Sequence, residues 1–306
     1  MKQCFLILAF LAAFDLSGYS QKCFENAKET RPFLSVDATA TYVTKLAEAV
    51  AAFAQNPDDV EAIIWFGRRT AYLGDYKKAI GIFSKAIDKH PNDARLYRHR
   101  GHRNITLRCF DDAIRDFETA SRLMKGKPDQ VEPDGLPNAK NIPTSTLQSN
   151  IWYHLGLANY LKGDYQKALK AYKAAAKVSN NPDMRVATAH WHYMTLRRLG
   201  KTKEAARLIE SFQGKIDIIE NDDYLKLIRL YRGESKAEDL LNEISGEANT
   251  LGNASLGYGL GNWFLYNGRR EDALRVFRQI TAGNQWASFG FIAAETNQIG
   301  KLKLGL

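Results

Sequence analysis

The sequence repeats itself at one fixed spacing, and this constrains the fold more than any other feature. Residues 60–93 are followed by residues 94–123, which match them at an offset of 34. A period of this length is typical of helix pairs stacked in an array. We therefore expect an all-α solenoid, which grows by adding units rather than by enlarging one core. The residues that return at this offset are Gly67 and Gly101, Ala79 and Ala113, Phe83 and Phe117, and Ala86 and Ala120.

The two stretches resemble tetratricopeptide repeats. In that family, small residues let the two antiparallel helices of a unit approach each other, and an aromatic residue fills the gap between neighbouring units. The resemblance implies a right-handed superhelical solenoid of about six repeats, whose function is to bind another protein. The first unit supplies the family pattern at Ile63, Gly67, Ala79, Phe83, Ala86 and Pro91.

The pattern continues along most of the chain. An apolar stretch from residue 36 would cap the stack before the first unit, and residues 286–299 would close it as one helix. The fourth and fifth units match the family weakly, because their small positions are lost. We assign residues 36–306 to the solenoid, after an irregular leader at 21–35. The later units are expected at 149–182, from about 186, at about 221–247 and from about 254.

One stretch breaks the spacing. Gly101 and its counterpart Gly156 are 55 residues apart, so 21 residues are inserted between the second and third units. They fall in residues 125–148, which contain four prolines and no helical period. A loop of this length in a compact array is usually functional or disordered. The apolar residues among the prolines favour an ordered segment that covers part of the solenoid as a flap.

The first helix of each unit lines the concave face in this family, so the resemblance implies a groove of aromatic, arginine and histidine side chains. Aromatic rings give contact area at low entropic cost, and arginine offers a planar fork to carboxylates and phosphates. We therefore expect a protein or peptide partner with an extended or acidic segment. The implied partner-binding residues are Trp65, Arg68, Tyr72, Arg95, Arg98, His99, His102, Tyr153, His154, His190, Arg197 and Arg198.

Two further groove positions, Trp191 and Tyr160, have a second interpretation. Both residues could equally pack between helices. Arg98, His99 and His102 are expected to be exposed, because burying an arginine without a partner is costly. By charge complementarity, the acidic residues of the insertion could occupy the basic groove while no partner is bound; they are Asp129, Glu132 and Asp134.

The histidines raise a second function class. His99 and His102 lie three apart on one helical face, and His154 and His190 belong to the next two units. Imidazoles converging in a groove could bind zinc and make a metal protein or a hydrolase. However, the His-Glu-x-x-His motif, a phosphate-binding loop and a nucleophile elbow are absent from the sequence. We therefore favour a non-catalytic scaffold with no cofactor and no metal. A structural assembly subunit is the third possibility.

The first 20 residues have the pattern of a secretory signal peptide. Lys2 precedes an apolar run, and small residues stand before a cleavage point at Ser20–Gln21. We expect an exported protein, either periplasmic or secreted. The mature chain has no further segment apolar enough to span a membrane.

Charge and cysteine content refine the expected partners. The formal net charge is +9, which favours acidic partners, while export argues against nucleic acid. After cleavage two cysteines would remain, Cys23 and Cys109. The sequence leaves open whether they form a disulfide, because it does not place them near each other.

Overall fold

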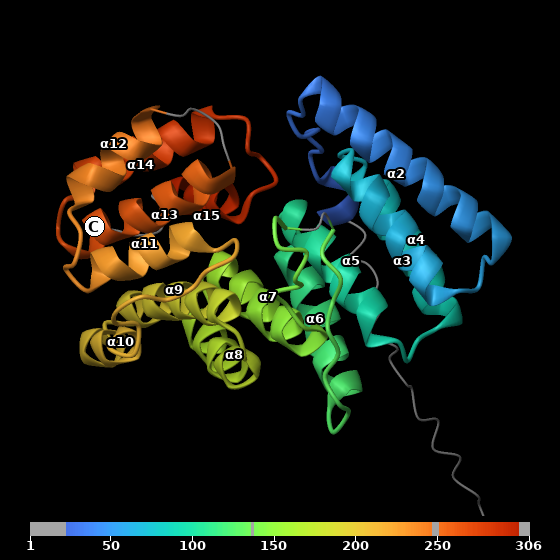
Figure 1. Ribbon diagram of the computed structural model, residues 1–306, viewed down its shortest axis with the longest axis horizontal. Coiled ribbons are helices and arrows are strands. Elements are labelled where there is room, and N and C mark those ends of the chain that lie inside the picture. The colour runs from blue at the N-terminus through green and yellow to red at the C-terminus, as the bar shows by residue number, and fades with distance from the viewer. Residues whose placement is uncertain (1–22, 136–137, 247–250, 300–306) are drawn as a thin grey trace, which may run out of the picture.

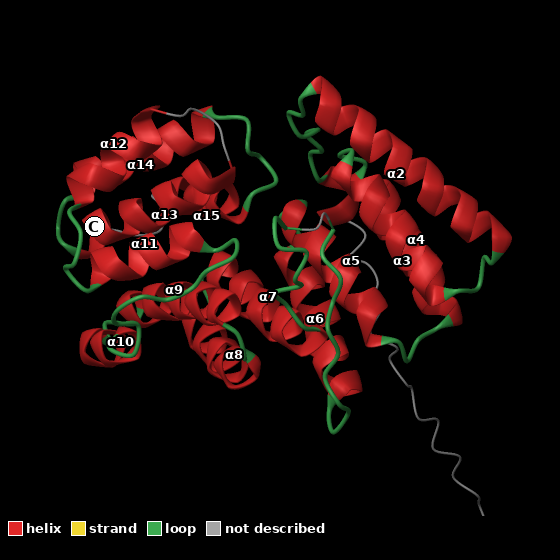
Figure 2. Ribbon diagram, in the orientation of Figure 1, coloured by secondary structure: helices red, strands yellow, loops and turns green. Residues whose placement is uncertain are grey.

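Helices packed side by side make a curved array (Figures 1 and 2). The computed structural model describes residues 23–135, 138–246 and 251–299. In these residues there is no strand, and one isolated antiparallel bridge joins Val131 to Thr146. The predicted all-α solenoid is therefore confirmed. The predicted signal peptide at 1–20 lies outside the described residues.

Six helix pairs follow one another along the chain, as the repeat pattern predicts. One helix flanks them at each end: α2 (Val36–Gln55) before the first pair and α15 (Phe289–Ile299) after the last. The pairs are α3 (Val60–Tyr72) with α4 (Tyr76–Lys89), α5 (Ala94–Thr106) with α6 (Phe110–Met124), α7 (Leu147–Lys162) with α8 (Tyr165–Val178), α9 (Pro182–Arg198) with α10 (Thr202–Ile209), α11 (Asp222–Tyr231) with α12 (Ala237–Gly246), and α13 (Leu251–Tyr266) with α14 (Arg270–Ala282).

The pairs form because a glycine and an aromatic ring meet inside each strongly matching unit. A Cβ atom placed on Gly67 would lie 2.4 Å from the ring of Phe83, and one on Gly156 would lie 2.7 Å from that of Tyr172. The ring therefore occupies the space that a side chain would need. The first helices also begin in a defined way, since the carboxylate of Asp93 accepts a hydrogen bond from the backbone N–H of Arg95 at 3.0 Å.

The C-terminal end of the array folds back onto the second unit. The guanidinium of Arg108, in the turn between α5 and α6, lies 2.7 Å from the carboxylate of Glu295 and donates to the carbonyl oxygen of Trp286 at 3.0 Å. Its carbon atom also lies 3.9 Å from the centre of the Trp286 ring. Helix α15 packs against α7 and brings Phe289 to 5.4 Å from the ring of His154. The superhelix is therefore tightly closed on its inner side.

A disulfide joins the leader to the second unit. Cys23 lies in a single helical turn at residues 23–26 and is bonded to Cys109, the N-cap residue of α6. The sequence had left this pairing open. Residues 27–35 are irregular, and Glu29 accepts a hydrogen bond from the backbone N–H of Lys77 at 2.6 Å. The leader is thus fastened along the outer side of the first two units.

The insertion between the second and third units runs from residue 125 to residue 146, and we call it the flap. Two backbone hydrogen bonds close its base: Glu132 donates to Ser145 at 3.0 Å, and Leu147 donates to Gln130 at 2.9 Å. Further along, the side chain of Asn181 on the edge of α9 donates to the carbonyl oxygen of Thr144 at 2.7 Å. The described parts of the flap are therefore held against several units.

Candidate functional site

The flap lies over the first helices of the first two units. An oxygen of the Glu132 carboxylate is 2.7 Å from Nη2 of Arg98 on α5, and both side chains are only 9% exposed. On α3, Arg68 donates to the carbonyl oxygen of Pro133 at 2.9 Å, and Arg69 donates to that of Gly135 at 2.5 Å. One extended stretch of the flap is therefore bound through one carboxylate and two backbone carbonyls.

Of the three acidic flap residues, Glu132 alone forms an ion pair with a groove arginine among the described residues. Asp129 instead accepts hydrogen bonds from the Thr146 hydroxyl at 2.6 Å and from the backbone N–H of Gln148 at 3.0 Å, at the start of α7. Burial raises the pKa of Asp134, and the charge of Glu220 adds to this while Arg68 opposes it. The expected occupancy of the groove by acidic residues therefore holds for Glu132.

Arg98 also organises two histidines. Its Nη1 lies 3.2 Å from Nδ1 of His99 and 3.4 Å from Nδ1 of His102. Because arginine can only donate, both Nδ1 atoms accept, which assigns the proton of each neutral ring to Nε2. Burial, followed by the neighbouring arginines, lowers the pKa of both rings well below the usual value. These histidines are therefore neutral hydrogen-bonding groups at neutral pH.

A small cavity of about 130 Å³ lies between α3, α4 and α5. The pKa of Arg103 is lowered to about 10, mainly by burial and also by the charges of Arg98 and Arg68, so positive charge is concentrated here. Among the described residues, Nε of Arg98 and Oε2 of Glu132 are buried without a hydrogen-bond partner. The cavity is lined by Arg68, Tyr72, Phe83, Arg98, His99, His102 and Arg103. Its chemistry suits an anionic group.

The predicted exposure of this cluster was wrong. Arg98 and His99 are buried and His102 is half-buried, because the flap covers Arg98 and supplies the carboxylate that pairs with it. Trp65, Arg68 and Tyr72 are half-buried nearby, and the Arg68 guanidinium lies 4.3 Å from the centre of the Trp65 ring. The groove residues of the first two units are thus together, but beneath the flap.

The tyrosine and histidine groove residues expected from the third and fourth units are inside the protein, which corrects their prediction as a contact surface. Tyr153, His154 and His190 are buried, and Nδ1 of His190 lies 3.1 Å from the Tyr231 hydroxyl. These side chains are buried because α11 and α13 pack against α9 on the inner side of the superhelix.

The two aromatic residues with a second interpretation, Tyr160 and Trp191, are also buried. The hydroxyl of Tyr258 on α13 donates to that of Tyr160 at 3.1 Å, and the rings of Trp191 and Tyr258 stack at 5.6 Å. For both residues, packing between helices is therefore the correct interpretation.

Three predicted arginines lie away from the cavity. Arg95 is paired with Asp93 at 2.6 Å and with Glu61 at 3.1 Å. Arg197 donates to the carbonyl oxygen of Tyr266 at 3.3 Å, and Arg198 donates to the Asn262 side chain at 2.8 Å. The contacts of Arg197 and Arg198 therefore connect α9 to α13.

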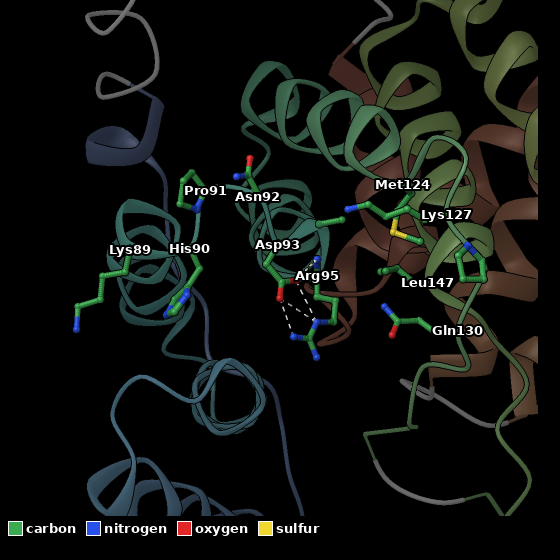
Figure 3. Close-up of a pocket in the computed structure, with 12 residues that line it drawn as sticks. Lys89, His90, Pro91, Asn92, Asp93, Arg95, Met124, Lys127, Gln130 and Leu147 are labelled. Atoms are coloured by element: carbon green, nitrogen blue, oxygen red, sulfur yellow. Dashed lines mark hydrogen bonds and ion pairs between the residues drawn. The ribbon is translucent and has the colours of Figure 1, made fainter.

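A larger hollow of about 670 Å³ lies at the outer edge of the flap (Figure 3). It lies between the turn that joins α4 to α5 and residues 127–130 of the flap. The Asp93 and Arg95 side chains face each other there, and Lys89 at the rim is 2.7 Å from Asp58. Arg95 and Lys89 are already paired with carboxylates, whereas Arg103 in the small cavity has no carboxylate partner among the described residues, so the small cavity is the stronger candidate for an anionic ligand.

The four histidines proposed as a zinc site do not converge on one point. Within the described ranges, one group of three potential metal-ligand atoms lies within 4.8 Å of one another: those of Cys23, Cys109 and Asp112. Its two sulfur atoms are joined in the disulfide, so they are not thiolates. The histidines instead contact Arg98, aromatic rings and backbone.

The sequence missed Arg69, Arg103 and the flap carbonyls that the groove arginines bind. Arg69 follows the predicted Arg68 on α3, one position beyond those that line the concave face in this family. Arg103 follows His102 in the same way. The signal that could have found them is the density of arginine on α3 and α5, which contain Arg68, Arg69, Arg95, Arg98, Arg100 and Arg103.

Comparison with known proteins identifies the repeats. Residues 149–182 and residues 69–93 each match a family described as tetratricopeptide repeat. A comparison with curated proteins found no match. Among solved structures, YrrB, described as a TPR protein with an unusual peptide-binding site, is 16% identical, with 82% of this chain and 97% of that chain covered and a TM-score of 0.43. A tetratricopeptide repeat protein from Parabacteroides merdae is 14% identical, with coverages of 85% and 93% and a TM-score of 0.47.

Proteins with these repeats are generally non-catalytic scaffolds that bind protein partners, and neither family match indicates an enzyme. In the part of the chain that the structure describes, none of the helices has the length and apolar character needed to cross a membrane. The repeat motif, the helix-pair architecture and the family matches agree: the chain contains tetratricopeptide repeats, and this fold suggests a protein-interaction scaffold.

Proposed function

We propose that the groove on α3 and α5 binds an extended acidic segment of a protein partner, and that the flap is an internal competitor for this groove. The observation that supports the proposal is the buried ion pair between Glu132 and Arg98. The flap stretch around Glu132 is itself an extended acidic peptide. A partner segment with the same chemistry would satisfy the same groups.

The contacts of the flap indicate what the partner would present. One carboxylate meets Arg98, and the backbone carbonyls one and three residues further along accept from Arg68 and Arg69. Backbone contacts give affinity for any extended chain, while the charged contact selects an acidic side chain. The cationic cavity beside Arg98 would accommodate further anionic atoms of the partner.

Exchange of the flap for a partner avoids the main cost of opening this site. A buried arginine left without its carboxylate is strongly destabilising, typically by about 3–5 kcal/mol. A partner carboxylate keeps Arg98 paired, and the released Glu132 is hydrated. The competition is therefore between two similar contacts, so a partner present at high local concentration would displace the flap.

The proposed place of action is outside the cytoplasm. The disulfide between Cys23 and Cys109 supports this, because such bonds persist in oxidising compartments. The signal-peptide pattern at residues 1–20 supports it independently. The N-terminus of the native protein should then be Gln21, as measured by mass spectrometry. A native chain that keeps residues 1–20 would contradict export.

A peptide that copies residues 128–135 tests the groove directly. Labelled with a fluorophore, it should bind the Glu132→Gln protein at least about ten-fold more tightly than the unaltered protein, since the internal competitor has lost its charge. A peptide with glutamine at the position of Glu132 should bind weakly to both proteins. The matched control is Glu118→Gln, an exposed glutamate on α6, which should leave the affinity unchanged. Equal affinity for the acidic and neutral peptides would refute the proposal.

A further inference from the structure

The outward side of α2 carries an apolar stripe that nothing in the described chain covers. The exposed fractions are 86% for Val36, 51% for Val43 and 42% for Val50. Ala40, Ala47 and Ala54 are exposed between and beyond them. A terminal helix of a repeat array normally needs a polar outer face for solubility. The outward side of α2 instead carries an apolar stripe.

The concentration of exposed apolar groups at this end is not general to the molecule. Among the described residues, the large hydrophobic side chains that are exposed are Phe33, Val36, Val43 and Val50 on or just before α2, with Val131 and Ile142 on the flap. The inner side of α2 is already occupied, since the Phe53 ring stacks on Phe66 of α3 at 5.3 Å. The stripe is therefore a second, separate face of the helix.

The spacing of the stripe is that of a coiled-coil seam. Its six residues follow one another at intervals of four, three, four, three and four. Alternation of three and four keeps apolar residues on one line that a second helix can follow. Valine and alanine also alternate along it, from Val36 to Ala54. Over its 20 residues α2 offers a seam about 30 Å long.

We propose that α2 pairs with α2 of a second copy of this chain, antiparallel, about a two-fold axis at Lys45. In this register each valine faces an alanine, so every layer joins one large and one small side chain. A parallel pairing would put valine against valine and alanine against alanine, which alternates crowded and empty layers. The facing pairs are Val36 with Ala54, Ala40 with Val50, and Val43 with Ala47.

The stripe is its own complement, which is the property that a two-fold interface requires. In the antiparallel pair, the second copy presents the stripe in reverse order, so each valine of one copy lies opposite an alanine of the other. Charge does not oppose the pairing. On the outer edge of the seam, the residues that directly follow the valines meet one another across the two copies. These pairs are Thr44 with Thr44 and Asp37 with Ala51, so like charges are not brought together. The assembly would carry two flap-covered grooves, and a partner with two acidic segments would gain from binding both at once.

Sedimentation velocity of the full chain over a series of concentrations tests this surface. The unaltered protein should dimerise, and Val43→Glu should raise the dissociation constant at least about ten-fold. The control is Thr41→Glu, which adds the same side chain to an exposed position of α2 outside the stripe. It should not change dimerisation. An unaltered protein that stays monomeric, or a Val43→Glu protein that dimerises as tightly as the unaltered protein, would overturn the proposal.

Mixing two variants tests the direction of the pairing. In the antiparallel register, residue 43 of one copy faces residue 47 of the other. The Val43→Glu protein mixed with the Ala47→Lys protein should therefore form heterodimers held by the new charge pair. In a parallel register the two new charges would not meet. Absence of heterodimers from the mixture would overturn the antiparallel arrangement. The peptide-binding test of the groove alters Glu132 on the flap and leaves the stripe of α2 unchanged, so the two proposals fail independently.

Discussion

The carboxylate of Glu132 lies 2.7 Å from Nη2 of Arg98, and both side chains are almost completely buried. The contact joins a segment inserted between two repeats to the helix that lines the groove of the second repeat. Burying one charge alone would be costly, so each residue accounts for the burial of the other. The inner surface of the first two repeats is consequently occupied by the chain itself.

Arg98→Gln should release the flap. Without the guanidinium, no positive charge compensates the burial of the Glu132 carboxylate. The flap should therefore detach from α5 and expose this carboxylate to water. The amide of Glu132, bonded to Ser145, should exchange its hydrogen at least about ten-fold faster, as measured by mass spectrometry or NMR. Adding Glu132→Gln to this variant should cause little further change, because the contact is already lost. If the fold-increases in exchange rate caused by the two single substitutions multiply in the double variant, Arg98 and Glu132 do not act through a common contact.

The repeats could be predicted from the sequence because they depend on local geometry. A glycine and an aromatic residue 16 positions apart, such as Gly67 and Phe83, lie on facing helices of one unit, and that distance is fixed by helix and turn lengths. The number of pairs, the flanking helices and the position of the insertion follow from the same spacing. None of them needs information about distant segments.

The candidate site could be predicted only in part, because it depends on distant segments. Position on a helix identified Arg68 and Arg98 as groove residues, and charge complementarity indicated the flap as an occupant, but not that this contact would bury Arg98. The burial of Tyr153 and His190 has the same origin, since helices later in the chain fill the inner side of their units. Likewise, the pairing of Cys23 with Cys109, 86 residues apart, follows from where the leader runs.

Replacing both cysteines with serine should lower stability without changing the helix content. The disulfide closes a long loop and restricts the unfolded chain, which is typically worth about 2–4 kcal/mol. Urea unfolding of Cys23→Ser/Cys109→Ser should show this loss. The unaltered protein under reducing conditions should match the double variant. If the reductant shifts both proteins equally, the bond is not responsible.

Stability should fall as the pH is lowered from about 6.5. Burial lowers the pKa of His190 to about 3 and that of His192 to about 4, while an unfolded histidine keeps a pKa of about 6.5. The unfolded state therefore binds protons first, so the stabilisation is fully present above pH 6.5 and is lost as the pH falls towards the folded values. Each such histidine contributes a slope of up to about 1.4 kcal/mol per pH unit.

Urea unfolding at pH 7 and at pH 5 measures this dependence. In His192→Gln the difference between the two pH values should be smaller, because one proton-binding group has been removed from the unfolded state. Since Nδ1 and Nε2 of His192 have no hydrogen-bond partner among the described residues, the substitution removes no such bond. An unchanged pH dependence in the variant would show that His192 is protonated equally in both states.

Arg108→Gln should loosen the closure of the superhelix. Arg108 holds the C-terminal cap through the Glu295 carboxylate, the Trp286 carbonyl and the face of the Trp286 ring. Its backbone φ of 63° lies in a region that residues with side chains rarely adopt, so these contacts also offset a local strain. Loss of the charged hydrogen bonds should lower the free energy of unfolding by about 1.5–3 kcal/mol.

Comparison with two further variants separates the clamp from a general effect of lost charge. Glu295→Gln should cost less than Arg108→Gln, because Arg108 keeps its contacts with Trp286. Arg115→Gln removes an exposed guanidinium that pairs with Asp112 on its own helix, and should be close to neutral. Small-angle X-ray scattering should show a larger radius of gyration for Arg108→Gln alone. If Arg115→Gln destabilises the protein as much as Arg108→Gln does, the closure between the second repeat and α15 does not depend on this arginine.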